Sequence, residues 1–198
     1  QNVFVQLTEK SKGDAYDRTG SVFIIPQDQH LSFLDGMQQG MNTLPLYYNG
    51  NGKKYQGVVR TANYTPILEL MRFFTFIVVI QFSYLKLKGK NWQDSVLYRK
   101  DMSELASAIS DREVYVGTFI GNYDKNGHEV SLELTVHPGF DNKHALKKLL
   151  PIFNTTNVME MGGQEYGTMF DKEKGLEVTF ELKEDASNVQ LRYVTTGH

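Results

Sequence analysis

The stretch VSLELTVH (residues 130–137) carries the clearest indication of the fold. In it Leu132, Leu134 and Val136 alternate with polar residues, so that one face of an extended chain points inward and the other meets water. A helix would need apolar residues at a spacing near 3.6 instead. The stretch therefore predicts a half-buried β-strand.

Similar short stretches, rich in β-branched and aromatic residues, recur along the chain and are separated by Gly, Asn and Asp. They predict strands over residues 2–7, 21–26, 114–120, 176–182 and 189–195. Turn signals stand between them at residues 49–52, 125–127 and 162–163. Only MSELASAI (residues 102–109) indicates a helical turn or two, with Asp101 as its cap. The chain is thus predicted to be an all-β, antiparallel β-sandwich.

Composition excludes several classes of partner and chemistry. The formal charge of −2 provides no basic field for nucleic acid, and the absence of cysteine excludes disulfides and thiolate catalysis. The apolar run FFTFIVVIQFSYL (residues 73–85) is shorter than the roughly 20 residues of a membrane helix, so it is predicted to form one or two buried strands. We expect no nucleic acid and no membrane among the partners. No leader precedes Gln1, which suggests a signal peptide that was removed or not included.

A domain boundary is expected near the polar, turn-rich stretch PGFDNKHALKK (residues 138–148). The prediction is a first domain over residues 1–140 and the truncated start of a second over residues 141–198. The second part is too short for a sandwich of its own.

One segment resembles a known catalytic sequence. GDAYDRTGSVF (residues 13–23) is similar to the catalytic segment of the peptide N-glycosidase F family, in which an aromatic-Asp-Arg triplet leads directly into a strand. Behind it RFFT (residues 72–75) and LYRKDMSELASA (residues 97–108) resemble further family segments in the same order. Residues 114–138 resemble the last hairpin of the family's first jelly roll, and residues 150–198 resemble the opening of its second.

The resemblance implies two eight-stranded antiparallel jelly rolls side by side, as in the copper monooxygenases that share this fold, with the active site at their interface. This chain would hold one complete jelly-roll domain and the beginning of a second. The implied reaction is hydrolytic and needs no metal or cofactor: water attacks the amide between asparagine and the first N-acetylglucosamine, leaving aspartate and releasing a glycosylamine. The implied protein is a bacterial monomer, periplasmic or secreted, that acts on N-linked glycoproteins or glycopeptides.

The resemblance assigns roles to the triplet and to one later residue. Asp17 would be the catalytic carboxylate, because a carboxylate near a water is the simplest general base. Arg18 would contact the substrate, and Tyr16 would offer its ring to a pyranose. Without the resemblance, Asp-Arg before a strand is more often a turn aspartate and a solvated arginine.

The second carboxylate of the family has no counterpart here. On the strand where the family carries a Glu followed by a Trp, this chain reads VGTFI (residues 116–120), so by the resemblance Phe119 would supply only a stacking surface. The remaining family carboxylate lies beyond the point that corresponds to His198. A complete site is therefore not expected within these 198 residues.

Two other functions stay open. One is a non-catalytic carbohydrate- or protein-binding jelly-roll module. The other is a copper-dependent monooxygenase relative, which would bind metal through clustered His and Met, and Met159, Met161 and Met169 suggest it. The five histidines form no short paired motif, so core methionines and surface histidines are the commoner interpretation, and no metal ligand is predicted.

Overall fold

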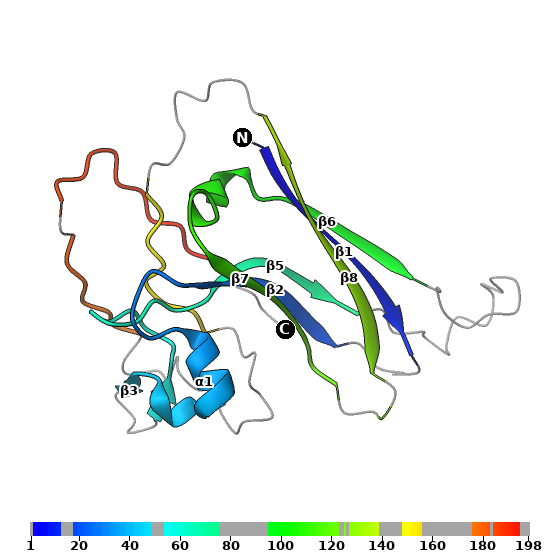
Figure 1. Cartoon of the computed structure of the whole chain (residues 1–198), viewed down its shortest axis with the longest axis horizontal. Helices are drawn as coiled ribbons and strands as arrows, with labels where there is room; N and C mark the ends of the chain where they lie inside the picture. Colours follow the sequence, from blue (N-terminus) through cyan, green and yellow to red (C-terminus); the bar gives the residue numbers. More distant parts are fainter. Residues whose placement is uncertain are drawn as a thin grey trace, which may run out of the picture.

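Two antiparallel three-stranded sheets form the main body of the folded structure (Figure 1). The computed structural model describes residues 2–12, 18–48, 54–75, 95–122, 125, 127–138, 148–155, 176–182 and 184–194. Its elements, in chain order, are β1 (Asn2–Ser11), β2 (Thr19–Pro26), α1 (Phe33–Gln39), η1 (Met41–Thr43), β3 (Leu46–Tyr48), β4 (Lys54–Gln56), β5 (Leu68–Phe74), β6 (Val96–Asp101), η2 (Ser103–Ala108), β7 (Val114–Ile120) and β8 (His128–His137).

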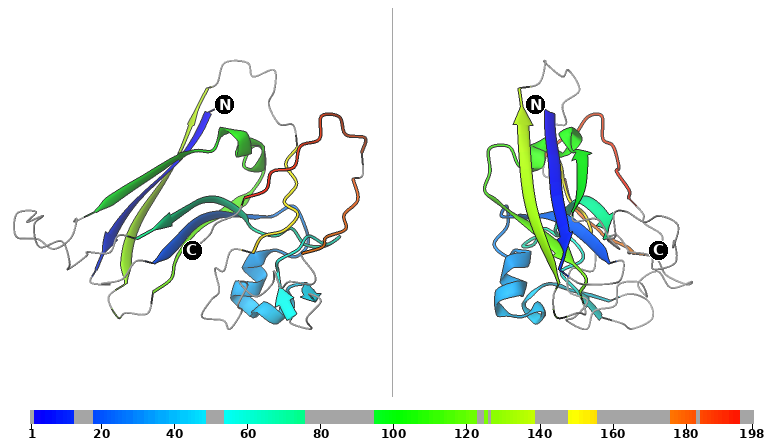
Figure 2. Two further views of the ribbon diagram at one scale, coloured as in Figure 1. Left: turned by 180° about the vertical axis from the view of Figure 1, so that it is seen from behind. Right: turned by 90° about the vertical axis from the view of Figure 1, so that its right-hand side faces the viewer.

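The strand order is β6-β1-β8 in the first sheet and β5-β2-β7 in the second, and β3 pairs with β4 separately. All these pairings are antiparallel. In Figure 1 and the left view of Figure 2, α1 lies beyond the second sheet as seen from the first. The predicted antiparallel β-sandwich is confirmed.

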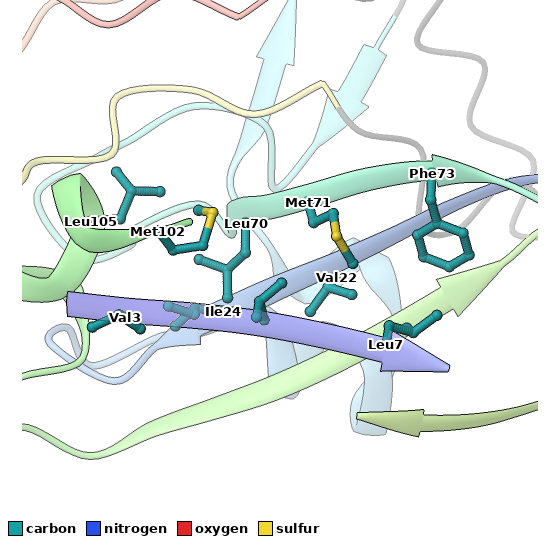
Figure 3. Packing of buried hydrophobic residues seen from close by; sticks show 10 residues of the cluster. Val3, Leu7, Val22, Ile24, Leu70, Met71, Phe73, Met102 and Leu105 are labelled. Carbon is teal, nitrogen blue, oxygen red and sulfur yellow. The ribbon is translucent and has the colours of Figure 1, made fainter. Parts of the chain in front are cut away.

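The main core fills the space between the two sheets. Alternate residues of β1 and β2 point into it, and Figure 3 shows them packed with residues of β5 and η2. Its buried members are Val3, Val5, Leu7, Val22, Ile24, Leu70, Met71, Phe73, Met102 and Leu105. Burial of each large apolar side chain contributes about 1.5–3 kcal/mol, so this core holds the sheets together.

Most strand predictions agree with the structure in place and type. The strands predicted over residues 2–7, 21–26, 114–120 and 130–137 correspond to β1, β2, β7 and β8. The predicted helical segment is a 3₁₀-helix, η2, whose Leu105 is buried in the core. Its N-cap residue is Met102, one residue after the predicted Asp101, and the Asp101 carboxylate accepts the Ser103 hydroxyl at 2.6 Å and the Ser103 N–H at 2.9 Å. These bonds, the hydroxyl bond first, lower the pKa of the Asp101 carboxyl.

Two predictions are wrong. Residues 176–182 and 189–194 form no strand in the described part of the chain, because a strand needs a neighbouring strand to satisfy its backbone and none is described beside them. Residues 114–138 are not a hairpin either. β7 pairs with β2 and β8 pairs with β1, so this stretch crosses from one sheet to the other.

Several predictions fall on residues outside the described ranges. These are the turns at residues 49–52 and 162–163, most of the apolar run over 73–85, Met159, Met161, Met169, His144 and His198. The described start of that apolar run belongs to β5, as a buried strand would. The division into domains at residues 1–140 and 141–198 stays a prediction.

The helix α1 was not predicted, because seven residues are too few for a clear helical period. It packs through Phe33 and Gly36. A capping box closes its first turn: the Asp35 carboxylate accepts the Ser32 N–H at 2.8 Å and the Ser32 hydroxyl at 2.9 Å. The backbone bond first, and then the hydroxyl bond, lower the pKa of the Asp35 carboxyl. This helix covers the outer face of the second sheet, where Phe33 packs with Phe23.

The later part of the chain lies against the region around β3 and β4. The Arg60 N–H donates to the Ile152 carbonyl at 2.8 Å, and the Asn154 N–H donates to the Val58 carbonyl at 2.8 Å. Val59 and Phe153 belong to one apolar cluster there. Among the described residues, no helix has the length and apolar character that crossing a membrane requires.

Candidate active site

The candidate site is built around the entry into β2. Asp17 and Tyr16 lie outside the described residues, which resume at Arg18. The Arg18 N–H donates to the Thr75 hydroxyl oxygen at 2.7 Å, and the Thr75 N–H donates to the Arg18 carbonyl at 2.8 Å. Arg18 immediately precedes β2 and Thr75 immediately follows β5. The two sequence segments singled out above, the triplet and RFFT, are therefore bonded to each other.

Gly20 allows β2 to begin at this place. Gly20 lies opposite Phe73 of β5, and a Cβ at Gly20 would come 2.3 Å from the Phe73 ring. Phe73 is itself buried and its ring lies 4.9 Å from that of Tyr98. A side chain at position 20 would have to displace this ring pair, so the glycine after the triplet is a packing requirement.

The other side of β2 is closed by β7. The Gly121 N–H donates to the Thr19 carbonyl at 3.1 Å, directly after the last residue of β7. The start of β2 thus lies between the ends of β5 and β7. Arg18 therefore lies at this end of the second sheet, with the end of β5 on one side and the end of β7 on the other.

Phe119 lies on the same sheet as the entry to β2. It is opposite Ser21, two residues into the strand after Thr19, and it is half-buried. Part of the ring packs against the apolar cluster that includes Phe23 and Phe33. The structure therefore brings Arg18 and Phe119 to the same end of one sheet, while the placement of Asp17 and Tyr16 relative to them stays a prediction.

The outer face of β7 has no space for a further side chain next to Phe119. Gly117 is two residues before Phe119 and so shares its face. A Cβ at Gly117 would come 2.6 Å from the ring of Phe23, which is buried. The aromatic ring occupies the position that a carboxylate-bearing side chain would need.

Gly117→Ala is expected to lower the free energy of unfolding by about 1–3 kcal/mol, because the new methyl group overpacks the Phe23 ring. Urea unfolding measures this loss. In a Phe23→Ala background the same change is expected to cost less than half as much, because the clash is then absent. If Gly117→Ala lowered the free energy of unfolding equally in both backgrounds, the clash with the Phe23 ring would be contradicted.

A charged pair on the outer face of β5 was not predicted. The Arg72 guanidinium contacts the Glu69 carboxylate at 2.7 Å, and both side chains are mostly buried. Residues three apart on a regular strand point to opposite faces. Here a register shift between Val22 and Phe23 of β2 leaves one residue of β5 unopposed, so Glu69 and Arg72 share a face. No pattern in the sequence indicates this irregularity.

Two further polar contacts, of Tyr98 with Phe74 and of His128 with Glu9, lie at the same end of the sandwich. The Tyr98 hydroxyl donates to the Phe74 carbonyl at 2.6 Å, and His128 Nδ1 lies 2.8 Å from a carboxylate oxygen of Glu9. Burial, and then the negative charge of Glu9, raise the pKa of the Tyr98 phenol. The hydroxyl can therefore donate its bond to the end of β5 up to a higher pH than a free phenol could.

The described residues contain no group of three or more histidine or acidic side chains close enough to hold a metal ion. His30, His128 and His137 are described. His128 bonds Glu9, and His137 lies 6.0 Å from the Phe4 ring in an edge-on arrangement. Neither partner is a second histidine.

Comparison with known proteins relates the chain to one family. Residues 1–136 match the family described as peptide-N-glycosidase F, N terminal. Two solved structures of PNGF-II, in C2 and P21 space groups, are each 54% identical in sequence with a TM-score of 0.79. Each match covers 89% of this chain and 33% of the PNGF-II chain. The search of curated proteins gives no match.

The match extends over most of the described strands and agrees with the antiparallel sandwich. It confirms the jelly-roll assignment of the fold. The chain spans about a third of the length of the PNGF-II structures that it matches. By the match over residues 1–136, the chain belongs to the peptide-N-glycosidase F family.

Proposed function

We propose that this chain forms the N-terminal part of a peptide-N4-(N-acetyl-β-glucosaminyl)asparagine amidase. The observation that carries the proposal is the pair of hydrogen bonds between Arg18 and Thr75, because it joins the triplet to the RFFT segment at one sheet end. Membership of the family supports the same reaction class. The residues that the resemblance places in the site, Asp17, Arg18, Tyr16 and Phe119, belong to this end of the sheet or directly precede it in sequence.

In the proposed reaction a water oxygen adds to the side-chain carbonyl carbon of the glycosylated asparagine. Asp17 accepts a proton from that water, which makes the oxygen a better nucleophile. The carbon–nitrogen bond then breaks, the nitrogen takes the proton back from Asp17 and leaves with the glycan as a glycosylamine, and aspartate remains in the peptide. No metal and no cofactor enter these steps.

The other assigned residues would bind the glycan. The Arg18 guanidinium donates hydrogen bonds in a fixed planar array, which suits sugar hydroxyls and carbonyl oxygens. Tyr16 and the exposed part of Phe119 would lie against pyranose rings. The proposed substrate is an N-linked glycoprotein or glycopeptide, and the proposed protein is a bacterial monomer, secreted or periplasmic, without a nucleic-acid or membrane partner.

A binding module is the second candidate, and Gly117 is the observation that favours it. A site in which Phe23 fills the space over β7 lacks a second carboxylate from that strand. Such a site could hold a glycan without cleaving its amide.

The test uses the intact protein, with any residues that its gene encodes beyond these 198, and a glycopeptide in water enriched in oxygen-18. We expect released glycan and one oxygen-18 atom in the new aspartate side chain, with the same yield in the presence of a metal chelator. Binding of the glycopeptide without release would establish the module instead. Release that stops with the chelator, or copper-dependent oxygen uptake, would also contradict the amidase without metal.

A further inference from the structure

The hydroxyl of Thr75 occupies an unusual place in the β2–β5 ladder. In a regular antiparallel ladder, every second pair of opposing residues exchanges two backbone hydrogen bonds, and the pairs between them exchange none. Thr19 lies opposite Phe74, so Arg18 and Thr75 are the next pair. The Thr75 N–H donates to the Arg18 carbonyl as the ladder requires, but the Arg18 N–H donates to the Thr75 hydroxyl oxygen at 2.7 Å.

The consequence is that both backbone polar groups of Arg18 are bonded to one residue. Thr75 is 3% exposed, so water competes little for these bonds. One peptide bond joins Arg18 to Asp17, so the backbone that carries the proposed catalytic carboxylate is held at its next residue. A serine could offer the same oxygen, whereas valine has the same shape as threonine without it.

The end of β5 is itself fixed from the opposite sheet. The Tyr98 hydroxyl of β6 donates to the Phe74 carbonyl at 2.6 Å, and the Tyr98 ring lies 4.9 Å from that of Phe73. Thr75 therefore follows a residue whose backbone carbonyl is bonded across the sandwich, while Thr75 itself is bonded to Arg18 of the neighbouring strand. Because the end of β5 is fixed in this way, the Thr75 hydroxyl can restrict the position of the Arg18 backbone more closely than a hydroxyl on a loop could.

We propose that Thr75 is a positioning residue, whose hydroxyl holds the backbone of Arg18 and through it the catalytic carboxylate of Asp17. The proposal rests on the proposed amidase function. It explains why the RFFT segment ends in threonine and occurs together with the aromatic-Asp-Arg triplet. Thr75 itself need not contact the substrate.

The first measurement is hydrogen exchange at the Arg18 amide, followed by mass spectrometry on the intact protein. Thr75→Val is expected to speed this exchange about tenfold, the factor that corresponds to the loss of one ordinary hydrogen bond. Thr75→Ser is expected to keep the wild-type rate. Unchanged exchange in Thr75→Val would overturn the proposed hold on Arg18.

The second measurement is the kinetics of glycan release. Thr75→Val is expected to lower kcat by about 10- to 100-fold, because small displacements of a reacting group have effects of this size. KM is expected to change less than about twofold, because the groups that bind the glycan remain. Thr75→Ser should restore kcat. An unchanged kcat in Thr75→Val with faster exchange at Arg18 would overturn the positioning role.

Thr65→Val is the matched control. Thr65 is also a buried threonine, 1% exposed, and its hydroxyl oxygen accepts a bond from the Arg60 guanidinium at 2.8 Å, away from the β2 entry. This variant is expected to lower the melting temperature like Thr75→Val but to keep kcat. An equal loss of kcat in both would assign the effect to stability and overturn the proposal.

Together, the kinetic measurement and the hydrogen-exchange measurement distinguish a failure of the proposed amidase function from a failure of the positioning role of Thr75. If the intact wild-type protein releases no glycan, the amidase function fails and the role of Thr75 in positioning Asp17 for that reaction fails with it. Faster exchange at Arg18 in Thr75→Val would then still establish the hold itself. If the wild-type protein is active and Thr75→Val is equally active, the proposed function stands and only the positioning role is overturned.

Discussion

Asp17→Asn in the intact protein is expected to reduce glycan release by about 100- to 10,000-fold, the range that a positioned general base contributes. An asparagine side chain has nearly the same shape but its amide does not accept a proton at neutral pH. Binding of the glycopeptide is expected to persist, because the groups proposed to bind the sugar remain. The rate of release at saturating substrate is the measurement.

Asp14→Asn is the matched control for that change. Asp14 is a carboxylate in the same segment, three residues earlier, and no role is assigned to it. Its variant is expected to keep glycan release. The melting temperature of both variants should stay near that of the wild type. Full activity in Asp17→Asn would remove Asp17 from the mechanism.

His128→Ala is expected to lower the free energy of unfolding by about 3–5 kcal/mol, since it leaves a buried carboxylate without its partner. Glu9 and His128 are 3% and 4% exposed in their side chains and lie 2.8 Å apart. Glu9 follows Val3, Val5 and Leu7 on the inward face of β1, so its carboxylate cannot turn to water. Urea unfolding of wild type and variant measures the difference.

A neighbouring pair provides the control. Lys12 contacts Glu129 at the same end of the β1–β8 pair, but both side chains are about half exposed. Lys12→Ala is expected to cost no more than about 1 kcal/mol. Replacing both buried partners, as in Glu9→Met with His128→Leu, should recover at least half of the loss, because no charge is then left buried. A loss in His128→Ala as small as that in Lys12→Ala would contradict this account of the end of the sandwich.

The buried pair also explains why β1 is longer than its apolar pattern predicts. The alternation of Val3, Val5 and Leu7 predicts a strand that stops at Leu7, because Glu9 is a charged residue at the next inward position. The structure continues β1 to Ser11, and His128, 119 residues away in sequence, satisfies the carboxylate. A partner so distant leaves no local signal.

For the candidate site, the resemblance to the family selected the triplet, the RFFT segment and Phe119 as candidates, and the placement of Asp17 and Tyr16 stays a prediction. The bond between Arg18 and Thr75 could not be found in this way, because it depends on the register of β2 against β5. The ion pair of Glu69 and Arg72 depends on an irregularity in that same register.

The sequence by itself determined the strand character of this protein, since period-two alternation is a property of neighbouring residues, and it indicated the family through the order of short segments. The tertiary structure decided which strands pair. Residues 114–138 contain two strands with a turn signal between them, and their hydrophobic faces fit a hairpin as well as a crossover. The crossover forms because β1 and β2 each offer a free edge in a different sheet, and backbone groups must pair wherever an edge is available.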